Sequence, residues 1–247
     1  MSRSNDPLFK AIFHRKSIRS FVESPDDDAY VPQILDFAQG VASLYPDIEM
    51  VFTIEREYPA GLFAIRAPYY LCVYTDVGEG FEHLVNTGYV LQHVDLYLHT
   101  LGLGSCWLGV AKPKVRAIEE KKYLIMLAFG RPKGSLERSG PQDFKRKALG
   151  EISSGDDPRL EAARLAPSAT NNQNWFFAAD AEQISVFTTK LSGVKKRLYQ
   201  NLTYVDAGIA LCHLQIASEH FALPFDYHVL STEDAPHKEG FEYLASV

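Results

Sequence analysis

The chain has 247 residues, of which 46% are hydrophobic and 23% are charged, and its formal net charge is −6 at pH 7. This length suits one large domain or two small ones, and the acidic balance argues against nonspecific nucleic-acid binding, which requires lysine and arginine to neutralise phosphates. Three cysteines without zinc-type spacing favour a reducing, cytoplasmic location, and no stretch is typical of a signal peptide or approaches the roughly 20 apolar residues of a membrane span.

The first part of the chain predicts helices joined to buried strands. Helices are expected from Asp6-Pro7, over about 30–42 and 81–101, and from Lys112-Pro113, with strands over 50–54, 69–75 and 123–130. Between them, GLGSCWLG at 102–109 indicates a glycine-rich turn. A long loop after Gly130 carries the basic run Phe144-Lys145-Arg146-Lys147.

The second part predicts a similar order of elements. A helix is expected over 158–166, strands over 174–179 and 184–189, a long apolar helix over 204–223 and a final strand over 225–230.

The two parts also align with each other, which indicates an internal duplication. A shift of 120 positions places Gly88 on Gly208 and His93 on His213, both within the long apolar helices. A shift of 125 overlays residues 37–52 on 162–177. We therefore expect a first half over 1–150 and a second, degenerate half over 151–247, intertwined as one globular unit.

The segment RKSIRSF at 15–21 is a candidate phosphate site. It brings Arg15, Lys16, Ser17 and Arg19 within five residues. Arginine forms bidentate hydrogen bonds to phosphate, and serine adds a neutral donor. The alternative is a basic helix C-terminus whose cations stabilise the last carbonyl groups.

The other polar segments are less specific. GLGSCWLG follows a helix rather than a strand, so it does not match the dinucleotide-binding fingerprint. Its glycines either let the backbone approach a ligand closely or form a helix end followed by a core turn. The basic run 144–147 is either a further phosphate contact or a solvated linker. Asp95 and His99 have a spacing that can hold a metal, but no third ligand has an obvious place, and we assign no metal.

The segment LAPSATNNQNWFF at 165–177 combines side-chain amides with aromatic residues. A surface turn does not need the aromatic residues, and a core strand does not need the amides. The mixture indicates a polar loop that leads into a strand and surrounds something flat and polar.

Together these segments resemble the nitroreductase family of FMN-dependent oxidoreductases. The family's Arg-Arg-Ser-x-Arg-x-Phe element is matched by residues 15–21, its Pro-Ser-Ser-x-Asn-x-Gln-Pro-Trp loop by 167–175, its Gly-Leu-Gly turn by 102–109, and its basic element by Lys145-Arg146-Lys147. Ala169 replaces the second serine of the family loop, and Asn174 replaces a proline. The matches span residues 9 to about 221.

The order of the motifs departs from ordinary members, which are intertwined homodimers with FMN at the interface. Their Pro-Ser-Ser loop precedes the Gly-Leu-Gly turn, whereas here it follows it. With the repeat, this implies two subunits fused in one chain, similar to the "putative TM nitroreductase" type. The fold implied is α+β, with two pseudo-symmetric halves that mimic the homodimer and a central, mostly antiparallel sheet flanked by helices.

The second pseudo-site is expected to be inactive, because GVASLYPDIEM at 40–50 lacks the Pro-Ser-x-x-Asn pattern. We therefore expect one FMN per chain. A fused pseudo-dimer completes its own site, so a monomer would suffice.

The resemblance assigns roles to individual residues. Arg15, Lys16, Ser17 and Arg146, with Lys145, would hold the phosphate, and Arg19 would lie near the N1/O2 edge of the flavin ring, where a cation favours the anionic reduced form. The residues expected to border the ring and ribityl chain are Trp107, Leu108, Gly109, Pro167, Ser168, Ala169 and Asn171. No catalytic side chain is named, because the flavin carries the chemistry.

The function implied is reduction of nitroaromatic or quinone-type acceptors by NADH or NADPH, with a ping-pong order. The alternative is a non-catalytic flavin-binding protein that acts as a carrier, a sensor or a degenerate homologue. Reductive dehalogenation and flavin cleavage, known in related folds, would need a distinctive substrate lid. No arginine cluster in the sequence is assignable to the 2′-phosphate of NADPH.

Overall fold

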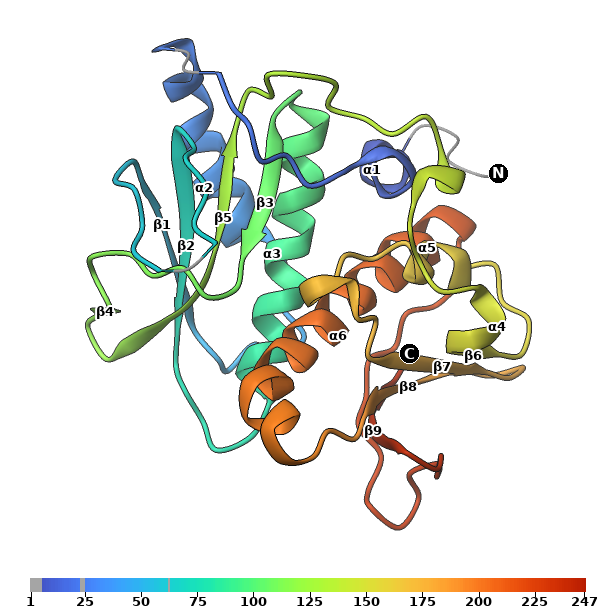
Figure 1. The fold of residues 1–247 in the computed structure, drawn as a ribbon. Coiled ribbons are helices and arrows are strands. Elements are labelled where there is room, and N and C mark those ends of the chain that lie inside the picture. Colours follow the sequence, from blue (N-terminus) through green and yellow to red (C-terminus); the bar gives the residue numbers. More distant parts are fainter. Residues whose placement is uncertain (1–5, 23–24, 62) are drawn as a thin grey trace.

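Two mostly antiparallel sheets lie on either side of a pair of long helices (Figure 1). The computed structural model describes residues 6–22, 25–61 and 63–247. The five-stranded sheet has the order β1 (Met50–Glu55), β2 (Tyr69–Thr75), β5 (Lys121–Gly130) and β3 (Gly104–Leu108), with β4 (Ala117–Ile118) also paired to β5. The four-stranded sheet has the order β6 (Ser153–Ser154), β7 (Trp175–Ala179), β8 (Ile184–Thr189) and β9 (Phe241–Ser246). The expectation of one central sheet is corrected to two, and only the pairing of β6 with β7 is parallel.

The helices fill the space between the sheets and cover their edges. The α-helices are α1 (Pro7–His14), α2 (Val31–Gly40), α3 (Glu82–Thr100), α4 (Leu149–Ile152), α5 (Leu160–Arg164) and α6 (Gly193–Phe221). Short 3₁₀ helices are η1 (Pro25–Tyr30), η2 (Pro141–Asp143) and η3 (Ala169–Asn171). Among the described residues, no helix is both long enough and apolar enough to cross a membrane.

Buried segments match the sequence predictions best. Strand β2 has the predicted bounds, and α3 differs from its prediction by one residue at each end. Both are buried along almost their whole length, so their apolar pattern is strong.

Four predictions are wrong. Residues 104–108 form strand β3 rather than a turn, because they pair in register with β5. No helix begins at Lys112, whose backbone pairs instead with Ala60 (N···O 2.8 and 2.9 Å). The segment 225–230 contributes only the bridge from His228 to Ser246, and the sheet ends in β9. Helix α6 begins at Gly193 rather than near Tyr204, and its first turns are exposed.

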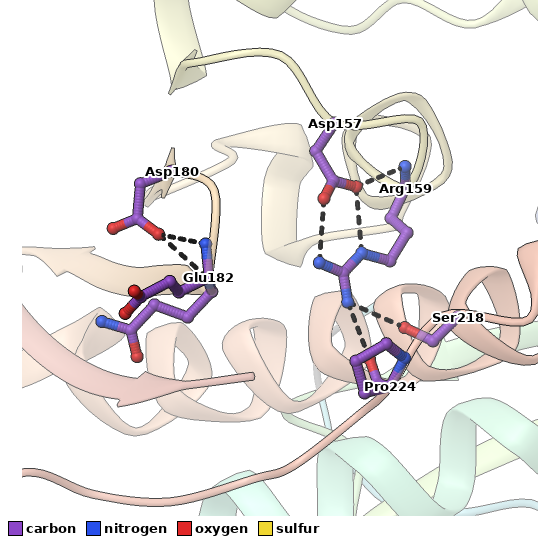
Figure 2. A network of polar contacts seen from close by, with 7 residues as sticks. Asp157, Arg159, Asp180, Glu182, Ser218 and Pro224 are labelled. Carbon is purple, nitrogen blue, oxygen red and sulfur yellow. Dashed lines mark hydrogen bonds and ion pairs between the residues drawn. The ribbon is translucent and has the colours of Figure 1, made fainter.

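Arg159 anchors α5 on the end of α6 (Figure 2). Its guanidinium is buried and forms a bidentate pair with Asp157, at 2.9 and 2.8 Å. The remaining terminal nitrogen donates to Ser218 Oγ (3.2 Å) and to the carbonyl of Pro224 (2.9 Å). Since α5 leads directly into the loop at 167–174, this anchor fixes where that loop begins.

The two central helices touch through glycines. A Cβ atom on Gly88 would lie 2.0 Å from the carbonyl oxygen of Val205, and one on Gly208 would lie 2.0 Å from that of Val85. The absence of both side chains therefore permits backbone contact at the crossing of α3 and α6.

We expect Gly88→Ala to lower the free energy of unfolding by roughly 1–3 kcal/mol or more, because the methyl group must push α6 away from α3. Gly150→Ala is the matched control, since its Cβ would meet nothing within 4 Å. That control should be neutral or stabilise by roughly 0.5–1 kcal/mol, as alanine favours a helix. Urea unfolding of both variants measures the difference, and equal midpoints would contradict the close crossing.

Candidate functional site

Arg15 lies at the end of α1 and is buried against α3. Its Nε is 3.0 Å from Asp95 Oδ2, and both side chains are almost fully buried. Ser105 Oγ of β3 donates a hydrogen bond to the other oxygen of Asp95. Arg15 Nη2 has no hydrogen-bond partner among the described residues. Asp95 therefore orients a guanidinium that keeps one terminal nitrogen available.

The segment that follows Arg15 runs beside β3. Ser17 forms a parallel bridge with Ser105, and the Ile18 N–H donates to the Ser105 carbonyl at 2.8 Å. A Cβ on Gly104 would lie 2.4 Å from Ile18 Cγ1, so this close approach depends on glycine. The Lys16 ammonium donates to the carbonyl of Glu137 (3.0 Å). Ser17 and Arg19 are thereby placed along one edge of the sheet.

The basic run at 144–147 and the amide-rich loop at 167–174 belong to separate sequence motifs, but they are joined by hydrogen bonds in the structure. Arg146 donates to Asn171 Oδ1 and, through Nη2, to the Leu165 carbonyl (3.2 Å). Asn171 Nδ2 donates to the carbonyl of Lys145 (2.6 Å), and the Lys147 N–H donates to Gln173 Oε1 (2.8 Å). Arg146 Nε is buried without a hydrogen-bond partner in the described part of the chain.

The amides of this loop stabilise its unusual backbone. Thr170, Asn171 and Gln173 have positive φ angles of 51°, 60° and 50°, a region where asparagine is enriched among non-glycine residues. Gln173 Nε2 donates to the Asn171 carbonyl (2.8 Å), and the Gln173 N–H donates to Ser168 Oγ (3.0 Å). The sequence predicts that these amides face a ligand, whereas in the structure they form hydrogen bonds within the loop and to the basic run.

Asp206 of α6 holds the middle of the loop. Both carboxylate oxygens lie 3.0 Å from the Ala169 N–H. Burial raises the pKa of this carboxyl well above its usual value, while the Ala169 N–H and Arg146 oppose the rise. The loop is therefore fixed to the central helix by a buried acid.

Positive charge gathers where these segments meet. The pKa of Arg146 is lowered to about 10, mainly by burial and in addition by the charges of Arg15 and Arg138, so these guanidiniums lie within electrostatic reach of one another. Arg138 donates to the Arg15 carbonyl, and its guanidinium lies 4.2 Å from the centre of the Phe144 ring. Arg138 was missed in the sequence, where it stands in a loop without a recognisable motif.

The end of β3 and the loop account for most of the remaining predicted residues. Trp107 is half-buried, and its Nε1 has no partner among the described residues. Leu108 is buried, and a Cβ on Gly109 would lie 3.1 Å from Leu202 of α6. Pro167 is buried, whereas the side chain of Lys145 is exposed.

The donor set fits a phosphate-bearing cofactor such as FMN. Arg15 Nη2 and Arg146 Nε are buried donors without partners among the described residues, and a third cation, Arg138, lies beside them. Like charges brought together out of water repel, so an anion between them would stabilise the arrangement. Within the described ranges, no group of three or more His, Cys, Asp or Glu could hold a metal ion.

The family is shown by comparison with known proteins. The model of the family described as "Putative TM nitroreductase" matches residues 7–218, so the chain belongs to this nitroreductase family and is an oxidoreductase by class. A search of curated proteins finds no significant match.

A solved structure shares its α+β fold over most of the chain, and two others match a smaller part of it. A "putative nitroreductase" from Thermotoga maritima MSB8 is 20% identical, with a TM-score of 0.64 over 93% of this chain and 92% of that one. A nitroreductase family protein from Clostridium difficile 630 is 18% identical, with a TM-score of 0.49 over 62% of this chain and 99% of that one. An "FMN-dependent Nitroreductase" from C. difficile R20291 is 16% identical, with a TM-score of 0.44 over 56% of this chain and 94% of that one.

Asp206→Asn tests the loop anchor through its pH dependence. Because the folded-state pKa of Asp206 is raised, its contribution to stability is complete below the unfolded value of about 3.9 and is lost as pH rises through the folded pKa. Asparagine still accepts the Ala169 N–H but does not titrate. The free energy of unfolding of the variant, relative to wild type, should therefore rise between pH 4.5 and pH 8 in urea titrations. A flat difference for Asp206→Asn would contradict the raised pKa.

Proposed function

We propose that this chain is an FMN-dependent oxidoreductase that uses NADH or NADPH to reduce nitroaromatic or quinone-type acceptors, with a ping-pong order. The observation that carries the proposal is the convergence of Arg15 and Arg146, each with a buried nitrogen that has no partner in the described residues. These two arginines are far apart in the sequence. The loop at 167–174 lies beside them, because Asn171 accepts a hydrogen bond from Arg146. The family match supports the same class of chemistry.

The roles proposed for the residues follow from their places. Arg15, Lys16, Ser17, Lys145 and Arg146 would hold the phosphate, and Arg138 is added to this set because it lies beside Arg15. Bound FMN would supply hydride acceptance and electron transfer. Arg19 would place positive charge at one edge of the ring, Trp107, Leu108 and Gly109 would border it, and Pro167, Ser168, Ala169 and Asn171 would close the opposite side.

Matching contacts support the proposal that residues 1–150 and 151–247 are two related halves. Asn86 Oδ1 accepts the N–H groups of Leu44 (3.0 Å) and Tyr45 (3.2 Å), as Asp206 accepts that of Ala169. Asn86 and Asp206 are related by the shift of 120 found in the sequence, and Leu44 and Ala169 by the shift of 125. The reciprocal contacts of Gly88 and Gly208 follow the same shift of 120. Two equivalent helices thus hold two equivalent loops.

The differences between the two proposed halves support a single FMN per chain. In the loop that corresponds to 167–174, the Tyr45 hydroxyl lies 2.5 Å from the Tyr227 hydroxyl, and the two rings meet edge to face at 5.6 Å. Aromatic side chains thus pack against a loop whose proposed counterpart carries the amides of the candidate site. The neutral Asn86 also replaces the acid, and the second half has no arginine-rich segment like 15–21.

The absorbance spectrum of the purified protein tests the proposal. We expect the bands of oxidised flavin, at most one equivalent of FMN per chain, and bleaching by NADH or NADPH. Two equivalents would contradict the single site. Flavin that no nicotinamide bleaches would favour the carrier, sensor or degenerate homologue, and protein that cannot be loaded with FMN would refute the proposal.

Arg146→Gln should weaken FMN binding by roughly 10- to 150-fold, because it removes one charge-assisted interaction of about 1.5–3 kcal/mol. Arg15→Glu should expel the cofactor, but it also sets a second carboxylate opposite Asp95, so Arg146→Gln, which keeps a hydrogen-bond donor for the loop, is the milder variant. Fluorescence titration with FMN measures the affinity, and the exposed Arg116→Ala is the control. Unchanged affinity in Arg146→Gln would remove this residue from the phosphate site.

A further inference from the structure

A cavity of about 460 Å³ opens beside the candidate site, where β2 begins and β5 ends. Its charged lining residues are Arg19, Arg66 and Lys133, and its apolar lining includes Phe21, Ala67 and Pro68. Its size is sufficient for a small anionic group together with an aromatic ring.

The backbone around this cavity is held in place. The Lys133 N–H donates to the Ser20 carbonyl (3.0 Å), and Phe21 forms an antiparallel bridge with Pro132. A Cβ on Gly130 would lie 2.8 Å from Pro68 and 3.5 Å from Phe21, so the end of β5 passes close to both lining segments. The three segments that carry the cations are therefore fixed relative to one another.

All three charged side chains of the lining are positive. Arg19, Arg66 and Lys133 form no ion pair with any residue in the described ranges, although the chain has a net charge of −6. The Arg66 guanidinium lies 5.4 Å from the centre of the Tyr58 ring, a contact that does not neutralise its charge. Three cations around one opening repel each other, and an anion in the cavity would relieve this repulsion.

Arg19 connects the cavity to the candidate site. Burial raises the pKa of the Cys106 thiol on β3, and the charges of Arg19 and Arg15 oppose the rise. Both guanidiniums therefore act on the same side chain of β3. The cavity lies at the Arg19 end of this edge, away from the phosphate-binding end at Arg15.

We propose that this cavity binds the carboxylate or phosphate group of a substrate that reacts at the neighbouring site. The inference rests on the proposed function and adds that one of the substrates carries a negatively charged group. Two sources share this chemistry: an electron-poor aromatic acceptor with an acidic substituent, and the 2′-phosphate of NADPH. The sequence did not indicate the site because its three cations are scattered along the chain, at positions 19, 66 and 133.

Binding of non-reacting probes to the purified, FMN-loaded protein is the first test. One pair is 4-fluorobenzoate and the neutral 4-fluorobenzamide, followed by fluorine NMR. The other pair is adenosine 2′,5′-bisphosphate and adenosine 5′-monophosphate, followed by calorimetry. We expect the additional anionic group to improve affinity in at least one pair, and Arg66→Ala/Lys133→Ala to reduce that preference by about tenfold or more.

The control is Lys122→Ala, an exposed lysine outside the cavity lining, which should keep the wild-type preference. If the double variant loses the preference for the anionic probe only in the benzoate pair, the cavity binds the acceptor. If it loses this preference only in the adenosine pair, the cavity binds the 2′-phosphate of NADPH. Equal affinities within both pairs, or a preference that survives the double substitution, would overturn the proposal.

Steady-state kinetics give a second readout. The ratio of kcat/KM for 4-nitrobenzoate over 4-nitrobenzamide, or for NADPH over NADH, should fall in the double variant by a similar factor. The binding experiment does not depend on turnover. Protein that takes up FMN and selects anionic probes, but is not reduced by nicotinamide, would therefore refute the proposed function while retaining the anion site.

Discussion

The contact between α3 and α6 determines the positions of most other parts of the molecule. Gly88 and Gly208 allow the two backbones to touch, and each sheet then packs on its own helix. Each helix also carries one buried carboxylate of the candidate site: Asp95 orients Arg15, and Asp206 holds the loop at Ala169. The distance between the guanidinium cluster and the loop is therefore set by how closely the helices cross. A small change at the crossing would be transmitted to the site through rigid elements rather than through flexible ones.

The electrostatics of the site combine groups that would be unfavourable alone. Asp95 and Asp206 are buried carboxylates, and Arg15, Arg138 and Arg146 are cations drawn together despite their repulsion. Asp95 offsets part of the cationic repulsion through its contact with Arg15, but buried guanidinium nitrogens without partners in the described residues remain. Such a surplus of aligned donors is typical of a site completed by an anionic ligand rather than of a purely structural ion pair.

The sequence predicted those parts of the fold whose apolar pattern is continuous, such as β2 and α3. It did not reveal β3, because the glycines of GLGSCWLG resemble a turn, and only pairing with β5 makes the segment a strand. The first turns of α6 were missed since Val194 and Leu198 are exposed there and the remaining residues are mostly polar. Strand β9 was missed because its partner β8 lies far back in the chain.

For the candidate site, short motifs predicted Arg15, Arg146 and the loop at 167–174, which lie near one another in the structure. Contacts that depend on tertiary structure could not be read from them. Asp206 lies in an apolar helix where nothing local indicates that it anchors a loop, and Arg138 gains its importance only from its contact with Arg15. The amides of Asn171 and Gln173 were recognised as unusual, but their first task is to stabilise left-handed backbone.

Asn86 and Asp206 have a consequence for how this protein can diverge. In a symmetric homodimer, one codon specifies the loop anchor of both subunits, and any replacement appears twice. In the fused arrangement proposed above, the two anchors are encoded separately, and they already differ in chemistry, since one is an amide and the other an acid. Selection can thus refine one loop for ligand contact while the other accumulates bulky aromatic side chains for packing, without either change being copied to its counterpart.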